Sequence, residues 1–586
     1  MEGGRDRWRL YGLAFSEGLA ALRAALSRLR HWPRLIVASA PERLLLAPQD
    51  LRTSDPTVAN DVYAGLFVFA GRALTTGGRS PFQFRPPSRG WGQGLYGFGW
   101  LRHLRAANTA LARANARALV NEFLVARPGS KIADETQVLA RRLISFLSQS
   151  PLLLEGADHE FYRRFMRALG RNIRLLERDL DTAVNPQARL LAAIALCYAG
   201  LSCEGYDGLL RKATRCLSRE LDRQILPDGG HISRNPRLLI ELLLDLLPLR
   251  QIYVSRGAEL PKALVGAIDR MLPMLRLFRH HDGTLAHVNG MGLTPADLLA
   301  TILIYDDVRA QPMRHAPHSG YERLQVGTAV VIADVGAAPP VRQSMEAHAG
   351  CLAFEFSSGT QRIVVNCGTS RGAHETASLA GRVTAAHSTA TVAESSSCRF
   401  VVPPGAPTQG WIAAWLERRL GPVVLQGPTS VVARRNDAAE AIELTASHDG
   451  YQPRFGILHE RRWRLSAGGD VLEGEDVFTS ERGAASAVAV RFHLHPSARA
   501  SQAQADGPVQ VVLANQETWR FEASAAASRI EESIFFATTD RPRRTEQIVL
   551  AITATGKASV RWRFERLRNA SGRDDGDAPR RQPQGS

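Results

Sequence analysis

The sequence predicts an α+β protein in which a helical N-terminal part precedes an antiparallel β-sandwich. Apolar residues recur at intervals of three and four from about residue 10 to residue 306, which is typical of amphipathic helices. After the stretch 306–324 the interval changes to two, which is typical of half-buried strands. With 586 residues, the chain is also too long for one ordinary domain. We therefore expect two structural parts that meet near this change of period.

The helical pattern is clearest in four stretches, 99–126, 161–180, 237–254 and 264–281. Short connections rich in Gly, Pro and Asp join such stretches, and no exact short repeat is present. A closed or curved layer of helical hairpins fits this pattern better than a repeat array. We expect this layer over residues 46–316. Residues 1–45 precede it and contain an arginine-rich amphipathic helix, without the apolar segment of a signal peptide.

Strand patterns fill the C-terminal part, for example in 346–368, 454–478, 487–496 and 559–567. Turns such as Ser-Ser-Gly-Thr and Ala-Gly-Gly-Asp separate them, which indicates a β-sandwich over residues 317–566. A hairpin turn at Ser358–Gly359 would place Cys351 opposite Asn366 or Cys367. The polar tail 567–586 is expected to be disordered.

The formal net charge of +16 points to a polyanionic partner, which can be nucleic acid, an anionic membrane surface or an acidic polysaccharide. No nucleic-acid-binding motif is present, so we expect no nucleic acid. No run of about 18 apolar residues predicts a transmembrane segment. The six cysteines form no CxxC pair, which argues against a disulfide framework or a zinc ribbon.

Two loops that end long helices combine Asp-Gly turns with histidine and asparagine. The first, LPDGGHISRNP (226–236), lets Ser233 or Asn235 cap the next helix, but a cap does not explain His231. The second, FRHHDGTLAHVNGMG (278–292), contains His287 and Asn289. The two loops can share one rim of the helical layer, or each can be an ordinary surface loop.

Histidines in the β part form a second set of candidates. His348, Asn366 and His387 can cluster around a metal or an anion, although their spacing matches no short zinc motif. His493 and His495 lie on one face of a single predicted strand, where they can bind a metal or a substrate or form a structural pair.

Four motifs together resemble the heparinase II/III family of polysaccharide lyases. DGGHISRNP resembles the family's DGG-H-x-x-x-S-P segment, and HAGCLAFEFSSGTQRIVVNCG resembles its H-G-H-A-D-x-L-S-F-E…R-x-I-V-D-P-G segment. TAAHSTATV resembles T-x-x-H-N-T-V, and RFHLHP matches a recurring late strand. The resemblance covers the chain from about Trp100 to Trp562. It implies an (α/α) toroid followed by a β-sandwich.

The resemblance also implies a reaction, the β-elimination of a polysaccharide that contains uronate. This chemistry needs a group that neutralises the uronate carboxylate, a base for the C5 proton and an acid for the leaving oxygen. The expected catalytic residues are His231, Asn235, His287 and His348. The expected substrate-binding residues are Arg234, Arg279, Asn289 and Glu346. A metal, zinc by preference, would be held by His348, Asn366 and His387, a weaker set than His/Asp/His.

Two departures from the family pattern leave a second function open. Glu346 stands where characterised members have a catalytic histidine, and the expected catalytic tyrosine is not evident in the second loop. The predicted function is therefore a lyase acting on an acidic polysaccharide, with a non-catalytic acidic-glycan-binding protein as the alternative. The family implies the cell envelope or periplasm, whereas the lack of a recognisable signal peptide favours the cytoplasm. The sequence leaves the oligomeric state open.

Overall fold

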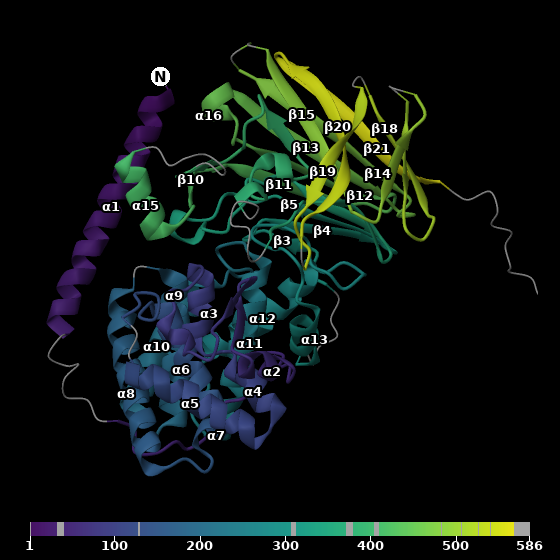
Figure 1. The fold of residues 1–586 in the computed structure, drawn as a ribbon. Coiled ribbons are helices and arrows are strands. Elements are labelled where there is room, and N and C mark those ends of the chain that lie inside the picture. The colour runs from purple at the N-terminus through teal and green to yellow at the C-terminus, as the bar shows by residue number, and fades with distance from the viewer. Residues whose placement is uncertain are drawn as a thin grey trace, which may run out of the picture.

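The computed structural model places a helical part beside two stacked β-sheets, and one long helix runs along both (Figure 1). It describes residues 2–31, 40–126, 129–183, 185–305, 312–370, 379–402, 410–481, 483, 485–504, 507–524, 527–539 and 541–567. The predicted disordered tail therefore lies outside the described residues, except for Leu567, which ends the last strand. Across the described ranges, no helix is both long and apolar enough to cross a membrane.

The helical part consists of short and long helices, as the sequence predicts, and it also contains a small β-hairpin that the sequence pattern did not indicate. The helices are α2 (Val58–Tyr63), α3 (Arg89–Gly97), α4 (Leu101–Ala107), α5 (Ala110–Ala126), α6 (Thr136–Ser148), α7 (Ser150–Leu154), α8 (His159–Thr182), α9 (Pro186–Ser202), α10 (Asp207–Gln224), α11 (Pro236–Ser255), α12 (Lys262–Leu277) and α13 (Ala296–Ile304). The hairpin consists of β1 (Leu66–Phe69) and β2 (Arg72–Thr75).

The predicted helix over 99–126 is broken into α4 and α5. Asn108 ends α4 in the left-handed conformation, with φ of 47°, and the hydroxyl of Thr109 accepts a hydrogen bond from the backbone N–H of Ala112. A left-handed residue interrupts the helical hydrogen-bond ladder, and the Thr109 hydroxyl then caps the next helix. The apolar spacing continues across the break, which is why periodicity alone does not reveal it.

Helix α9 forms the centre of the helical core. Most of its residues are buried, and it packs against α6, α8, α10 and α11. Small side chains permit this crowding: a Cβ added to Gly200 would lie 2.8 Å from the Cβ of Leu210 on α10. The alanine-rich composition of α9 is thus a packing requirement of a helix that is enclosed by others.

The C-terminal part is a sandwich of two antiparallel sheets. One sheet has the strand order β11-β12-β13-β14-β21-β18-β17-β16, and the other has the order β19-β20-β15-β7-β6-β5-β4-β3, with β8 also paired to β15. Aromatic side chains fill the space between the sheets, including Phe354, Trp463, Phe492 and Trp562. The first strand, β3, begins at His315, two residues before the predicted start of the sandwich.

The strands of the first sheet are β11 (Val431–Asp437), β12 (Ala441–His448), β13 (Ile457–Ser466), β14 (Val471–Ser480), β16 (Arg499–Gln502), β17 (Val509–Val512), β18 (Thr518–Ala523) and β21 (Lys557–Leu567). Those of the second are β3 (His315–Ala316), β4 (Tyr321–Val326), β5 (Ala329–Asp334), β6 (Phe354–Ser358), β7 (Gln361–Val365), β8 (Ala390–Val392), β15 (Ser486–Leu494), β19 (Ser528–Phe535) and β20 (Arg543–Ala554). Outside the sheets lie β9 (Arg399–Phe400), β10 (Val424–Gln426), α15 (Trp411–Leu420) and α16 (Gln452–Phe455).

The predicted register of the β6–β7 hairpin is shifted. Ser358 pairs with Gln361, so the turn is at Gly359–Thr360, and Gly359 has the positive φ of 53° that such a turn requires. Cys351 precedes β6, so it does not pair across this hairpin, and all six cysteines are buried free thiols.

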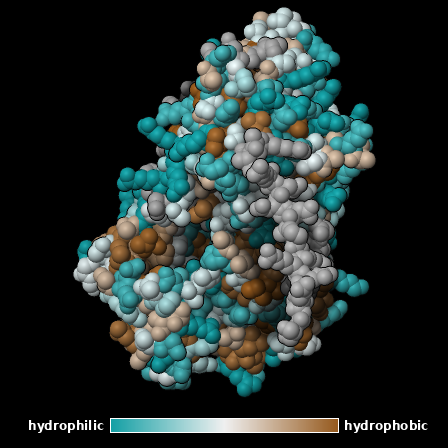
Figure 2. Space-filling model, turned by 90° about the vertical axis from the view of Figure 1, so that its right-hand side faces the viewer, coloured by the Kyte–Doolittle hydropathy of each residue, from teal (hydrophilic) through white to brown (hydrophobic). Residues whose placement is uncertain are grey.

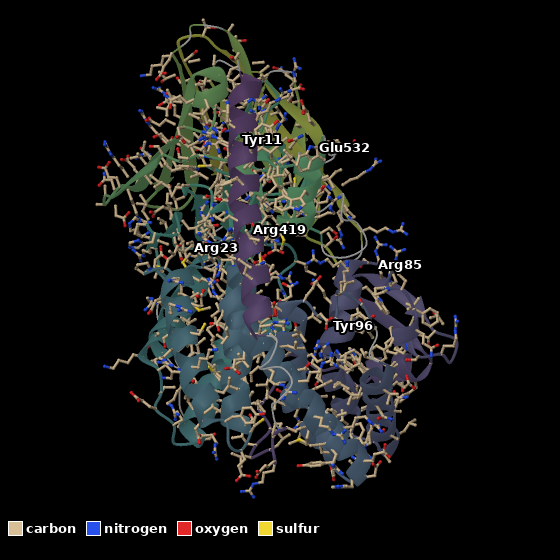
Figure 3. The ribbon with its side chains drawn as sticks, turned by 90° about the vertical axis from the view of Figure 1, so that its left-hand side faces the viewer. Tyr11, Arg23, Arg85, Tyr96, Arg419 and Glu532 are labelled. Atoms are coloured by element: carbon tan, nitrogen blue, oxygen red, sulfur yellow. The ribbon has the colours of Figure 1, made fainter. Side chains whose placement is uncertain are left out.

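Helix α1 (Glu2–His31) runs along the outside of the molecule and contacts both α8 and α15 (Figure 3). Leu10, Leu13 and Ala14 pack against the apolar cluster around α15. The buried carboxylate of Glu17 forms ion pairs with Arg342 at 2.6 Å and with Arg419 at 3.0 Å. The predicted N-terminal amphipathic helix is therefore docked on the body through one of its faces.

Candidate functional site between the toroid and the sandwich

The Asp-Gly-Gly loop is built to contact the sandwich. Asp228 accepts hydrogen bonds from the N–H of Gly230 at 3.1 Å and of Ser319 at 2.7 Å, which ties the loop to the start of the sheet. Gly229 has φ of 86°, and a Cβ there would lie 2.0 Å from the carbonyl oxygen of Arg270. Only glycine fits this close approach.

His231 uses both ring nitrogens inside the helical part. Its Nδ1 accepts the N–H of Ser233 at 3.0 Å, so its Nε2 donates to Oε1 of Gln224 at 3.2 Å. The side chain is 1% exposed, and burial lowers the pKa of His231 to about 3. In this arrangement His231, a predicted catalytic residue, is a neutral histidine that stabilises the loop.

Arg234, a predicted substrate-binding residue, joins the two parts of the protein instead. Its guanidinium donates to the carbonyl oxygens of Ser319, Gly320, Gly336 and Ala337 and to Oδ1 of Asp334 at 2.5 Å. It also stacks on the ring of Tyr321, 4.6 Å from the centroid. With its donors occupied by the protein, Arg234 has no group left for a ligand carboxylate. The sequence did not reveal this role because all its partners lie at least 85 positions away.

Asn235 both caps a helix and holds a carboxylate. Its Oδ1 accepts the N–H of Arg237 at 2.9 Å, with Pro236 as the first residue of α11, which confirms the predicted cap. Its Nδ2 donates to Oε2 of Glu346 at 2.7 Å. Both the oxygen and the nitrogen of the Asn235 amide thus form a hydrogen bond within the protein, and Glu346 is the acceptor for the nitrogen.

Glu346 lies close to Asn235 and Arg237 of the helical part. The residue Glu346 is exposed to solvent, but the protein around its carboxyl group shields that group from water and so raises its pKa. The positive charge of Arg237 and the hydrogen bond from Asn235 oppose this rise. Arg237 is nearly buried, and its Nε has no hydrogen-bond partner among the described residues. Asn235, Glu346 and Arg237 therefore form a polar cluster at the position where the family resemblance predicts a catalytic site.

The second loop brings His287 to the same interface. The backbone N–H of His287 donates to Oε1 of Glu355 at 3.0 Å, and its Nδ1 lies 3.2 Å from the same oxygen. Its Nε2 has no hydrogen-bond partner in the part of the chain that the structure describes. A general base needs one ring nitrogen that a carboxylate orients and a second that is free to accept a proton, and His287 has this arrangement.

Glu355 is a central residue of the site that the sequence analysis missed. It is fully buried and forms ion pairs with Arg362 and His287, and it accepts the N–H of Asn366 at 2.9 Å. Burial alone would raise the pKa of Glu355, but Arg362 and His287 hold it well below its usual value. A signal was available, since a glutamate in the apolar strand CLAFEF has to be paired when buried.

Asn289 connects the loop to the sandwich. Its Nδ2 donates to the hydroxyl of Tyr321 at 2.7 Å and to Oδ2 of Asp334 at 2.9 Å, and its Oδ1 accepts the N–H of His348 at 3.1 Å. The predicted substrate-binding amide is thus enclosed by protein groups. Arg279, also predicted to bind substrate, has an exposed side chain on the helical part.

The predicted metal ligands His348 and His387 are hydrogen-bonded to each other. The N–H of Gly290 donates to Nε2 of His348 at 3.0 Å, so Nδ1 of His348 donates to Nε2 of His387 at 3.0 Å. Nδ1 of His387 in turn donates to the carbonyl oxygen of Val383 at 2.8 Å. All four ring nitrogens are used, and burial lowers the pKa of His387 to about 4 and that of His348 well below its usual value.

Asn366 completes the predicted metal set with a neutral side chain. Its Oδ1 accepts the N–H of Ser388 at 2.9 Å, which turns Nδ2, a donor without a partner among the described residues, toward the interior. A cation needs acceptors, so His348, Asn366 and His387 do not fit a metal as they are arranged. Among the residues that the structure describes, no group of three or more His, Cys, Asp or Glu is placed to hold one.

The family's aspartate in H-G-H-A-D corresponds to Gly350. A Cβ at this position would lie 2.7 Å from Cδ2 of His387. The ring of His387 therefore takes the space that a larger side chain would need. This close contact and the His348–His387 hydrogen bond form one packed unit.

The late-strand histidines have separate surroundings. His493 is buried, with Nδ1 2.8 Å from Oγ of Ser533 and Nε2 donating to the carbonyl of Ala385 at 3.0 Å. The ring of His495 lies 5.4 Å from that of Phe535, which also contacts the ring of His287 at 5.2 Å. His493 is thus a structural residue, whereas His495 contacts the same Phe535 ring as His287.

A cavity of about 730 Å³ opens inside the helical part next to the polar cluster. Arg237 and Glu241 line it from the first two turns of α11, together with charged and aromatic side chains that include Arg52, Arg102, Arg141, Asp50, Asp61, Asp297, Phe67, Phe69 and Trp100. Figure 2 shows a hollow on one face of the molecule between the helical part and the sheets. The arginines of the lining are matched in number by its carboxylates, so the cavity is not strongly basic.

Comparisons with known proteins agree with this architecture. The family described as "Heparinase II/III-like, C-terminal" matches residues 308–563. FtsZ-localized protein C of Caulobacter vibrioides is 32% identical over 546 residues, which cover 90% of this chain and 91% of the relative.

Two solved structures share the fold at low identity. The heparan sulfate lyase HepC of Pedobacter heparinus gives a TM-score of 0.60 at 14% identity and covers 94% of this chain and 89% of its own. A structure of heparinase III gives a TM-score of 0.68 at 11% identity and covers 84% of this chain and 80% of its own. The predicted fold class, an (α/α) toroid followed by an antiparallel β-sandwich, is confirmed. The chain belongs to the heparinase II/III family.

Proposed function

We propose that the protein binds a polysaccharide chain in the cavity beside Asn235 and does not cleave it by β-elimination at that residue. One observation carries the proposal: the Asn235 amide donates its hydrogen bond to Glu346, a carboxylate of the protein itself. In β-elimination, such a donor has to neutralise the carboxylate of the substrate. Glu346 accepts one of the two N–H groups of this amide, and its carboxylate adds a negative charge that repels a uronate.

The surrounding residues support a binding role. His231, His348 and Asn289, three residues expected to serve the reaction, have their side-chain groups in hydrogen bonds within the protein. The cavity combines charged hydrogen-bonding groups with aromatic side chains, a lining that suits the hydroxyl groups and the apolar faces of sugars. Its mixed charge does not require the acidic glycan that the net charge of the chain suggested.

The test measures polysaccharide binding and the formation of an unsaturated product on the same protein. Purified protein is titrated calorimetrically with neutral and acidic polysaccharides, including heparan sulfate, alginate and hyaluronate, and ultraviolet absorbance reports any unsaturated uronate. We expect binding to at least one polymer without an absorbance rise. Arg237→Ala removes a cation from the cavity wall and should weaken binding, whereas Arg462→Ala on the outer sheet face should not. A rise in absorbance that survives repurification would overturn the proposal.

A second candidate, β-elimination of an acidic polysaccharide with His287 as the base, is favoured by the Glu355–His287 pair. Glu355 holds Nδ1 and leaves Nε2 open, which suits abstraction of the C5 proton. If this candidate holds, His287→Gln abolishes the absorbance rise and Glu355→Gln reduces it. His493→Gln, in a histidine enclosed by Ser533 and Ala385, should leave it unchanged once folding is confirmed.

The name of the Caulobacter relative suggests where in the cell this function takes place. That protein is called FtsZ-localized, and we infer that this chain is also recruited where FtsZ assembles. A fluorescent fusion of the full chain, imaged together with labelled FtsZ in the source organism, tests this inference. A uniform distribution in dividing cells would contradict it.

A further inference from the structure

Helix α1 has two apolar faces, and the body of the protein covers only one of them. Leu10, Leu13, Ala14 and Glu17 face the body, where they meet the cluster around α15 and the guanidinium groups of Arg342 and Arg419. These four positions repeat at three and four residues, so they form one stripe along the helix. The stripe fastens α1 to the folded body.

The second stripe faces away from the body. Its six large side chains are Trp8, Tyr11, Phe15, Leu19, Leu22 and Leu26, again spaced by three and four. Trp8 and Phe15 are each 77% exposed and Leu22 is 56% exposed. At about 100° per residue, this stripe lies about 150° around the helix from the docked one. Six large apolar residues in one row exceed the scattered exposure of an ordinary surface.

The charge of α1 indicates what covers this stripe. Its 30 residues contain six arginines and three acidic residues, and one of those, Glu17, is already paired with the body. Arg9 and Arg23 are exposed. At about 100° per residue both lie on the same side of the outer stripe, and Figure 3 labels Arg23 on α1. Arginines beside a stripe that begins with Trp and Tyr and continues with Phe and Leu suit a bilayer surface with anionic head groups. An acidic protein groove would not require the aromatic residues to cluster at one end.

We propose that α1 lies in the surface of an anionic membrane through its outer stripe and holds the whole protein against that membrane through its inner stripe. The helix contacts α8 of the toroid and α15 beside the sandwich, so both parts are held at the membrane in one orientation. Because α1 is docked rather than tethered by a loop, the membrane-bound protein has a defined face toward the lipid.

Vesicle flotation with the full chain tests the proposal. Wild-type protein should float with vesicles of phosphatidylcholine and phosphatidylglycerol and float weakly with phosphatidylcholine alone. The double variant Phe15→Glu/Leu22→Glu should lower the bound fraction at least about tenfold, because charged residues replace the inserted ones. Leu111→Glu on α5, a residue that is 59% exposed, is the matched control and should bind as wild type.

A third variant separates the two faces of α1. Glu17→Gln weakens only the docked stripe, so its vesicle binding should remain, while hydrogen exchange in α1 becomes faster in the absence of vesicles. Circular dichroism confirms that each variant is folded. The proposal fails if wild type does not float with anionic vesicles or if Phe15→Glu/Leu22→Glu binds as wild type does. It also fails if the double variant converts a wild-type dimer to a monomer in sedimentation, since the outer stripe would then bind a second copy.

Discussion

The side-chain amide of Asn235 donates a hydrogen bond of 2.7 Å to Oε2 of Glu346, and this contact joins the first turn of a toroid helix to a loop of the sandwich. The partners are 111 positions apart in the chain. The family resemblance predicts that Asn235 meets the acidic group of a substrate. Here a carboxylate of the protein takes that place, and the consequences can be measured.

Replacing Glu346 by Gln should make the site accept acidic glycans. The variant keeps the shape of the side chain and removes the negative charge beside Arg237. We expect the affinity for an acidic oligosaccharide to rise about tenfold, equivalent to about 1.4 kcal/mol. Calorimetric titration measures this change. Glu443→Gln, on the outer face of the sandwich, is the control, and equal effects of the two changes would contradict the prediction.

Replacing Arg234 by Ala should destabilise the contact between the two parts. The change leaves Asp334 buried without its ion-pair partner and frees four carbonyl groups, which costs about 3–5 kcal/mol. Urea unfolding followed by tryptophan fluorescence gives the free energy of unfolding. Arg279→Ala, in an exposed arginine of the helical part, should change this free energy by less than about 0.5 kcal/mol. Similar losses in both variants would argue against Arg234 as a joining residue.

Acid should destabilise the protein through its buried histidines. The pKa values of His231 and His387 in the folded protein are about 3 and about 4, below the value of 6.5 expected in the unfolded chain. Between these values the unfolded chain binds more protons, so stability is complete above about pH 6.5 and falls as the pH drops toward 4. Each such histidine contributes a slope of about 1.4 kcal/mol per pH unit.

The variant His231→Gln isolates one of these contributions. It should lower the slope of unfolding free energy against pH by about one proton between pH 4 and 6. Urea unfolding at a series of pH values measures the slope, and His159→Gln on α8 serves as the control for a histidine at an exposed helix end. An unchanged slope in His231→Gln would show that this histidine is not buried in its neutral form.

Gly350 should not tolerate even one added methyl group. A Cβ there would lie 2.7 Å from the ring of His387, which is itself bonded to His348, so Gly350→Ala should cost about 1–3 kcal/mol. Thermal unfolding measures the loss. Gly208→Ala in α10 meets only a side-chain nitrogen of Arg211 at 3.9 Å and favours the helix, so it should be neutral or stabilising.

Removing metal should leave the protein unchanged. The nitrogens of His348 and His387 are used in hydrogen bonds, and Asn366 presents a donor rather than a carboxylate. We therefore expect the same melting temperature after dialysis against a chelator and after addition of zinc. Differential scanning calorimetry measures both. A rise in melting temperature at one equivalent of zinc, lost in His387→Gln, would show that the site binds a metal.

Local patterns in the sequence predicted much of the fold. The stretches 161–180 and 237–254 lie within α8 and α11, because helical periodicity depends on neighbours a few positions away. The cap at Asn235 followed for the same reason, since it involves only the next two residues. The stretch 99–126 showed the limit of this information, because a single left-handed residue, Asn108, divides it.

The sequence by itself determined the order of the two parts, the type of each element and the residues that gather where the parts meet. Only the tertiary structure decided what these residues do. Asn235 meets Glu346, His287 meets Glu355, and His348 meets His387, each across at least 39 positions. The physical reason is that a periodic pattern reports burial of one side of an element, whereas a hydrogen bond depends on how two distant segments dock. The protonation and the availability of each side chain follow from that docking.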